Sequence, residues 1–192
     1  MDSQPKKNNP ISGFIDYVEL FVVAICIVIV LFSLAFRTCT VDGSSMNNTL
    51  INGEVLLVSD MLYSPERGDI IVFHHTDDSL SVQSNKPLVK RVIGVGGDIV
   101  KINYSTWEVT ITDKDGNTRT LDEDYINLSN RPSAFYGIKE YKVPEGSLFV
   151  MGDNRNDSLD SRYSSIGYVD ERSVLGKVVL RVSPLSKIGT VN

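Results

Sequence analysis

The chain has 192 residues, of which 42% are hydrophobic and 22% are charged, with 14 glycines, 7 prolines and 2 cysteines. This composition is typical of a globular protein and excludes a collagen-like, disordered or disulfide-stapled chain. The formal net charge of -5 opposes the phosphate backbone of nucleic acid, so we do not expect nucleic acid as a partner.

An apolar segment lies near the N-terminus. Residues 20–36 are 17 consecutive residues without a charge, which is enough for a helix to cross a bilayer. A cleavable signal peptide or a buried core helix is the alternative, but the apolar run is longer than the core of a typical signal and no small-x-small cleavage site follows it. We therefore expect a transmembrane anchor at 18–36 between a tail at 1–17 and a domain at 37–192.

The positive charges beside this segment predict its orientation. Lys6 and Lys7 precede it and Arg37 follows it, and acidic residues count little in the positive-inside rule. We expect a single-pass protein of the cell membrane whose tail is cytoplasmic and whose domain at 37–192 is extracytoplasmic, with the lipid bilayer as a partner.

Beyond residue 40, short apolar and β-branched runs alternate with turn residues, a pattern that indicates strands. The expected strands cover residues 55–58, 70–73, 88–93, 109–112, 147–151 and 174–182. Residues 113–117 contain a glycine and predict the turn of a hairpin within 109–121. Residues 103–143 are polar and irregular, so we interpret them as a flap or subdomain inserted into the core. The predicted fold class is mainly β after one transmembrane helix.

A serine-bearing turn follows the anchor at residues 41–50. It does not fit the nucleophile elbow of α/β-hydrolases, because Asn47 stands at the last glycine position and no βα alternation surrounds it. His74 and His75 are adjacent on a strand-like run that points them to opposite faces, which leaves a Ser-His-Asp triad as an alternative. A buried lysine of lowered pKa can also serve a serine nucleophile. Lys90, flanked by apolar residues, is the candidate.

Four motifs follow the anchor in order. They are VDGSSM with a following Thr-Leu at 41–50, GEVLLV at 53–58, KRVIGVGGD at 90–98 and GDNRNDSLDSR at 152–162. Through them the chain resembles the type I bacterial signal peptidases, membrane-bound serine proteases that remove signal peptides from exported preproteins. One motif alone is weak evidence, but four in order behind an anchor are specific.

The resemblance implies roles for particular residues. Ser45 corresponds to the nucleophile and Lys90 to the general base, which would accept the serine proton and return it to the leaving amine. Ser158 corresponds to a hydroxyl that orients the lysine amine. Asp160 and Arg162 correspond to a pair that braces the site, and Asp153 lies in the same motif as a structural residue.

The turn before the nucleophile departs from part of the family. Backbone N–H groups of Gly43, Ser44 and above all Ser45 are expected to stabilise the oxyanion. Many members carry a serine hydroxyl where Gly43 stands, whereas many Gram-positive members carry glycine, so the chain is Gram-positive-like. Asn48 and Gly96 stand where the family usually has proline, which loosens two loops without removing a reacting group.

The substrate implied by the resemblance is the extended end of a signal peptide, with small side chains near the cut. Val41 and Val89 precede the nucleophile turn and the lysine, and we expect them to line the pockets for those side chains. We expect no cofactor, and no metal, because residues 153–164 lack the calcium-loop pattern.

Two other functions remain open at this stage. The first is a self-cleaving repressor-type Ser/Lys peptidase, against which the anchor argues because such repressors are soluble and bind DNA. The second is a catalytically silent, membrane-anchored β-domain, for which Ser45 and Lys90 would be dispensable.

Overall fold

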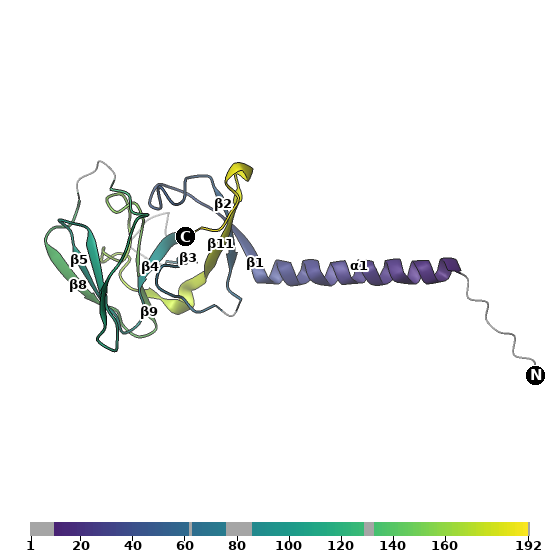
Figure 1. The fold of residues 1–192 in the computed structure, drawn as a ribbon, viewed down its shortest axis with the longest axis horizontal. Coiled ribbons are helices and arrows are strands. Elements are labelled where there is room, and N and C mark those ends of the chain that lie inside the picture. The colour runs from purple at the N-terminus through teal and green to yellow at the C-terminus, as the bar shows by residue number, and fades with distance from the viewer. Residues whose placement is uncertain (1–9, 62, 76–85, 129–132, 192) are drawn as a thin grey trace, which may run out of the picture. The chain divides into compact units, whose positions relative to one another are not determined.

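The computed structural model describes residues 10–61, 63–75, 86–128 and 133–191. Residues 1–9 of the expected tail and 129–132 of the expected insertion lie outside the described residues. The chain divides into two compact units, Met1–Arg37 and Thr38–Asn192. The first holds one long helix, and the second is built mainly from strands (Figure 1). The prediction of a mainly β fold after a single apolar helix is confirmed.

Helix α1 covers Pro10–Ala35. Proline is well tolerated at the first position of a helix, because the N–H that it lacks would have no partner there. The segment Phe14–Ala35 is 22 residues long with a mean hydropathy of 3.0, and none of it is buried inside the protein. The helix is therefore long and apolar enough to span a membrane. It begins before the expected anchor at 18–36, and Phe36 already belongs to the first strand.

The larger sheet has seven strands in the order β1-β2-β11-β3-β4-β9-β10. Their bounds are β1 Phe36–Thr40, β2 Val55–Ser59, β3 Ile70–Phe73, β4 Leu88–Gly94, β9 Ser147–Met151, β10 Val169–Asp170 and β11 Val174–Ser183. Two short 3-10 helices, η1 Glu171–Ser173 and η2 Leu185–Lys187, flank β11. Strand β4 pairs with β3 on one side and β9 on the other. A side chain in the middle of β4 is thus surrounded by protein.

The smaller sheet has four strands in the order β7-β6-β5-β8. They are β5 Ile99–Asn103, β6 Glu108–Thr112, β7 Thr118–Thr120 and β8 Ile138–Lys142. The predicted hairpin is confirmed, since β6 and β7 pair antiparallel and the Asp113 N–H donates to the Asn117 carbonyl over 2.9 Å. The region at 103–143, predicted as polar and irregular, carries three strands of this sheet, β6, β7 and β8, and the first strand of the sheet begins at Ile99.

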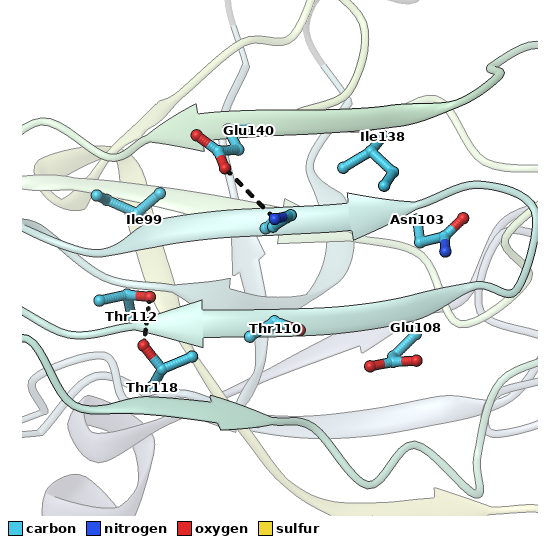
Figure 2. Close-up of a pocket in the computed structure, with 9 residues that line it drawn as sticks. Ile99, Asn103, Glu108, Thr110, Thr112, Thr118, Ile138 and Glu140 are labelled. Atoms are coloured by element: carbon cyan, nitrogen blue, oxygen red, sulfur yellow. Dashed lines mark hydrogen bonds and ion pairs between the residues drawn. The ribbon is translucent and has the colours of Figure 1, made fainter.

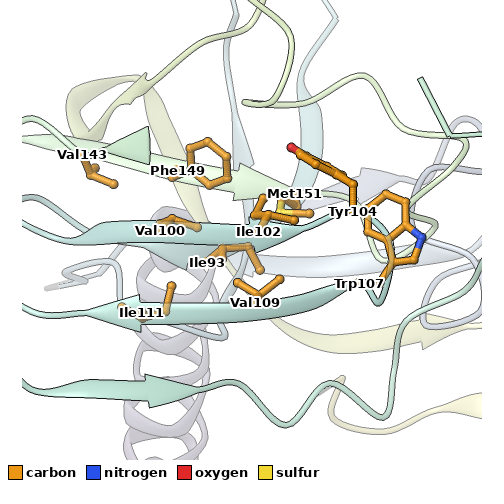
Figure 3. Close-up of a cluster of buried hydrophobic side chains, with 10 residues drawn as sticks. All are labelled: Ile93, Val100, Ile102, Tyr104, Trp107, Val109, Ile111, Val143, Phe149 and Met151. Atoms are coloured by element: carbon orange, nitrogen blue, oxygen red, sulfur yellow. The ribbon is translucent and has the colours of Figure 1, made fainter. Parts of the chain in front are cut away.

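The two faces of the smaller sheet differ in chemistry because strand side chains alternate between them. The outer face is polar and lines an open hollow of about 440 Å³ (Figure 2), where Lys101 pairs with Glu140 and Thr112 with Thr118. The inner face carries a buried apolar cluster (Figure 3), formed by Ile93, Val100, Ile102, Tyr104, Trp107, Val109, Ile111, Val143, Phe149 and Met151. Members from β4 and β9 join the smaller sheet to the larger one.

A second apolar cluster fixes the segment that carries the predicted nucleophile. Val41, Met46 and Leu50 come from this segment and are at most 5% exposed. They pack against strand residues of the larger sheet, namely Leu56, Val58, Ile70, Val72 and Val178. Burial of several apolar side chains on both sides of Ser45 therefore holds the serine turn on the sheet.

We predict that Gly176→Ala destabilises the protein. Gly176 has φ +145°, and a Cβ there would lie 2.5 Å from the Ser59 carbonyl oxygen on the adjacent strand. The substitution should cost at least about 1 kcal/mol, which lowers the thermal midpoint of the full chain in detergent by about 3 °C or more. Gly189→Ala is the matched control, because a Cβ at Gly189 meets nothing within 4 Å. Equal midpoints for the two variants would contradict this account of β11.

Candidate active site

The structure brings Ser45 and Lys90 together. The Lys90 Nζ donates to the Ser45 Oγ over 2.8 Å and to the Val89 carbonyl over 3.0 Å. Lys90 lies in the middle of β4 and is 3% exposed, whereas Ser45 is half-buried. Since the lysine is buried and the serine is partly open, the serine hydroxyl is the member of the pair that a substrate can reach.

Burial sets the protonation of Lys90. Loss of hydration lowers the pKa of this amine to about 8, and the nearby Arg162 adds to the lowering. The carboxylates of Asp160 and Asp153 act in the opposite direction by favouring the charged form. An amine with this pKa is partly neutral near pH 7 and can accept a proton, as a free lysine side chain cannot.

The turn around Ser45 is shaped by its own backbone and by Gly43. Gly43 adopts φ +107°, a left-handed conformation that glycine enters without steric cost. Its N–H donates to the Asn52 Oδ1 over 2.8 Å. In this structure the Gly43 N–H is therefore bonded to a side chain, which favours Ser45 over Gly43 as the oxyanion donor. The role of Gly43 is to turn the chain.

The last motif holds the serine turn from the other side. The Asn154 N–H donates to the Ser45 carbonyl over 3.0 Å, and the Asn154 side chain donates to the Ser44 carbonyl over 3.1 Å. The Ser44 hydroxyl donates to the Asp157 carboxylate over 2.6 Å. Asn154 was not singled out from the sequence, and Asp157 was considered only as part of a calcium loop, although both lie within the 152–162 motif. Their position in that motif was the available signal.

Ser158 lies close to the pair but does not bond to the lysine in this structure. A Cβ built at Gly152 would lie 2.3 Å from the Ser158 Oγ and 2.4 Å from the Ser45 carbonyl oxygen. The Ser158 hydroxyl is therefore next to the nucleophile turn. It is buried near the Asp160 carboxylate, whose pKa it helps to lower, so its role in orienting the lysine stays a prediction.

Two buried ion pairs surround the lysine. The Arg162 Nε and Nη2 donate to the two oxygens of Asp160 over 2.7 and 2.8 Å, and the Gly152 N–H donates to the same carboxylate over 3.0 Å. Burial opposes ionisation of Asp160, but the Arg162 hydrogen bonds and charge hold its pKa below the ordinary value. Asp160 therefore remains a carboxylate in the protein interior.

The second pair connects three segments. Asp153 accepts from the Arg91 Nε and Nη2 over 2.9 and 2.8 Å, and from the Thr49 hydroxyl over 2.5 Å. Arg91 follows Lys90 in β4, and Thr49 lies four residues after Ser45. One buried carboxylate thus ties the lysine strand to the serine segment, and neither Arg91 nor Thr49 was singled out as a partner from the sequence.

A cavity of about 460 Å³ lies beside the serine turn. Its lining residues are Cys39, Thr40, Val41, Asp42, Asn52, Gly53, Lys86 and Pro87. Val41 is among them, as expected. Val89 is not, and packs instead against the apolar cluster to which Val41 belongs. Of the two predicted pocket residues, Val41 lines this cavity and Val89 does not, and their role in binding a substrate stays a prediction.

The histidines occupy a different position from the one that a triad requires. They follow the end of β3, where the His74 N–H donates to the Ser173 carbonyl and the His74 side chain is exposed. The recorded hydrogen bond of the Ser45 hydroxyl joins it to Lys90. The geometry therefore favours the lysine over the triad alternative.

A serine hydroxyl bonded to a buried amine of lowered pKa is the arrangement of serine hydrolases that use a lysine base. Comparison with known proteins is consistent with that class. The chain belongs to the signal peptidase family, peptidase S26, which it matches over residues 14–183.

Individual relatives cover most of the chain. It is 35% identical over 198 residues to a signal peptidase I of Leptolyngbya laminosa, covering 97% of this chain and 87% of the relative. It is 30% identical over 195 residues to a signal peptidase I of Bacillus licheniformis, covering 97% of each. A crystal structure of a signal peptidase I from Enterococcus faecalis V583 is 30% identical, covers 60% of this chain and 97% of that chain, and has a TM-score of 0.43.

The family match favours a signal peptidase over the repressor-type alternative. The same match, together with the single apolar helix at the N-terminus, indicates a membrane-anchored protein. The family match at 14–183 includes both the apolar helix and the strands of the second unit.

We predict that the buried pair at the site matters far more for stability than an exposed pair of the same type. Arg162→Met leaves Asp160 charged and fully buried, so the free energy of unfolding should fall by about 3 kcal/mol or more. Arg172→Met removes a partner of Asp170 that is 90% exposed, and should change the free energy of unfolding far less, because exposed ion pairs contribute little to stability. Denaturant unfolding of both full-length variants measures the difference, and similar losses would contradict the assignment.

Proposed function

We propose that this protein is a membrane-anchored serine endopeptidase that cleaves signal peptides from exported preproteins, with Ser45 as nucleophile and Lys90 as general base. The observation that carries the proposal is the 2.8 Å hydrogen bond between the Ser45 hydroxyl and the buried Lys90 amine. Membership of the signal peptidase family supports the substrate class.

In the proposed reaction the neutral Lys90 amine accepts the Ser45 proton while the serine oxygen bonds to the scissile carbonyl carbon. When the carbon–nitrogen bond breaks, the lysine returns that proton to the leaving amine and an acyl-enzyme remains. The lysine then accepts a proton from a water molecule while the water oxygen bonds to the acyl carbon. As the bond between this carbon and the Ser45 oxygen breaks, the lysine returns the proton to the serine oxygen, and the signal peptide leaves as a carboxylic acid. With a pKa of about 8, roughly one Lys90 side chain in ten is neutral at pH 7.

Neighbouring groups support each step of this proposal. The Ser45 N–H is the proposed oxyanion donor, because the Gly43 N–H is occupied by Asn52. The amine loses its bond to Ser45 once the acyl-enzyme forms. The Ser158 hydroxyl lies beside the turn and near Asp160, and we assign it to hold the amine at that stage.

The proposed substrate also fits the cavity and the anchor. An extended peptide would lie along the edge of the serine segment and place a small side chain in the cavity lined by Val41. We propose that Val89 limits the depth of this subsite from behind. The basic residues Lys6 and Lys7 support a cytoplasmic tail, which places the domain on the side where signal peptides are removed.

We predict that Ser45→Ala and Lys90→Ala each abolish cleavage of a synthetic signal-peptide substrate by the full chain in detergent or lipid. For the wild type, kcat/KM should rise with pH through a limb near the lysine pKa of about 8, because only the neutral amine accepts the proton. Lys101→Ala is the control, since Lys101 lies on the polar face of the smaller sheet.

Other results would separate the alternatives. Full activity of a folded Lys90→Ala protein would place the base elsewhere and return His74 and His75 to consideration. No cleavage by the wild type on a panel of signal peptides would favour the silent β-domain.

We predict that shortening the pocket residues broadens specificity. Val41→Ala enlarges the cavity directly, and Val89→Ala does so from behind. Removing two methyl groups from either should let the enzyme accept side chains larger by one or two carbons, each worth about 0.8 kcal/mol of burial. Relative kcat/KM values on substrates with Ala, Val and Leu near the cut measure this, and unchanged selectivity in both variants would rule out the subsite.

A further inference from the structure

Arg162 is held by more than its carboxylate partner. Two of its guanidinium nitrogens bond to Asp160, but the third, Nη1, is buried without a hydrogen-bond partner among the described residues. The side chain is fully buried. A buried cationic group with an unsatisfied donor is costly unless another interaction compensates it. Aromatic rings provide that interaction here.

Two rings face the guanidinium. The Arg162 carbon Cζ lies 5.5 Å from the centre of the Trp107 ring and 5.3 Å from that of Phe135, both within the range of a cation–π contact. Tyr104 completes the group, since its ring stacks on Phe135 with centres 5.1 Å apart and meets Trp107 edge-on at 5.5 Å. We call Tyr104, Trp107 and Phe135 the aromatic cage.

The cage belongs to the inserted region, whereas Arg162 belongs to the last motif. Figure 3 shows Tyr104 and Trp107 at one end of the apolar cluster, beyond the end of β5. Phe135 lies before β8. The inserted region therefore supplies the rings that contact Arg162, and the charge of Arg162 in turn lowers the pKa of Lys90, the proposed base.

Trp107 occupies an unusual backbone conformation. Its φ is +61°, the only positive value among the described residues other than glycine. This left-handed conformation disfavours a bulky side chain and favours glycine or asparagine. A large ring at such a position indicates that the ring itself is required there, and its contact with Arg162 is a specific candidate for that requirement.

We propose that the aromatic cage is a positioning element for catalysis, which fixes Arg162 against Asp160 and thereby sets the pH range in which Lys90 works as the base. The proposal rests on the proposed function, because it acts through Lys90. None of the three rings is a catalytic residue, since their contacts are with Arg162, with Lys139, with one another and with Tyr141 and Tyr163.

The charges around the lysine give the direction of the effect. Asp160 and Asp153 favour the protonated amine, and Arg162 opposes them. The other titratable groups that Arg162 acts on are Tyr104 and Tyr141, whose hydroxyls bond to each other over 2.8 Å. Burial raises the pKa of both phenols, so they stay neutral in the working range. If Arg162 loosens while Asp160 stays, the lysine becomes harder to deprotonate.

The test is the pH dependence of kcat/KM for full-length Trp107→Leu and Phe135→Leu. The acid limb should move to higher pH, because an Arg162 guanidinium that is no longer fixed beside Asp160 opposes protonation of Lys90 less. Trp107→Phe retains an aromatic face and should recover at least half of the shift. Phe135→Leu is the safer variant because Phe135 is only half-buried, and the chain's single tryptophan then reports by fluorescence that the cage site is still folded.

Phe149→Leu is the matched control. Phe149 is a fully buried aromatic residue of the same cluster, and its recorded ring contacts are with Tyr141 and Tyr168. It should lower the thermal midpoint without moving the acid limb. Unmoved limbs in both cage variants, or an equal shift in Phe149→Leu, would overturn the proposal. Failure of the proposed function is distinct, since it would appear as an inactive wild type or an active Lys90→Ala.

Discussion

The burial of one amine is the constraint on which the rest of the site depends. Lys90 is 3% exposed in the middle of β4, and an isolated ammonium in such a place would be strongly disfavoured. The protein meets this constraint in two ways. It lowers the pKa of the amine by burial, and it keeps the carboxylates of Asp160 and Asp153 close enough to limit the lowering. The result is an amine that is neither fully charged nor fully neutral near pH 7.

The two carboxylates that raise the pKa of Lys90, those of Asp160 and Asp153, are buried as well. Each of them therefore needs a buried partner of its own. Asp160 remains ionised because Arg162 and the Gly152 N–H bond to it, and Asp153 is paired with Arg91. Buried ion pairs add little net stability compared with apolar packing, but breaking one is costly. The pairs therefore act chiefly to fix positions. They link β4, the serine segment and the last motif, which are far apart along the chain.

Part of this architecture could be predicted from the sequence. The strands at 55–59, 70–73, 88–94 and 174–183 follow from apolar runs between turn residues, and the hairpin from its glycine-bearing turn. Strands β5 and β8 were missed because charged residues interrupt their apolar pattern, namely Lys101 in β5 and Lys139, Glu140 and Lys142 in β8. The helix begins earlier than expected because Phe14 and Ile15 extend its apolar surface past two acidic residues.

The candidate site also has a part that could be predicted from the sequence and a part that could not. Ser45 and Lys90 could be named in advance because motifs record residue types at fixed spacing. The bond from Gly43 to Asn52, the bond from Ser44 to Asp157 and the cage around Arg162 could not. Each depends on which segments the fold brings together, and no local pattern of hydrophobicity or spacing encodes that contact.

The inserted region contributes side chains that hold charged residues of the site in position. Each of three arginines near the serine turn has a partner from this region. Tyr125 lies 3.9 Å from the guanidinium of Arg91, Glu123 bonds to Arg155, and the cage holds Arg162.

The backbone of the same region is also joined to the last motif. The Asn127 N–H donates to the Asp153 carbonyl, and the Arg155 N–H donates to the Asn127 carbonyl, each over 2.8 Å. A segment that moved away as a lid would break these bonds and separate the buried Arg155 guanidinium from Glu123, at a cost of several kcal/mol. The described part of the insertion is therefore better understood as a fixed support that keeps the charges around Lys90 in place while the substrate enters from the serine side.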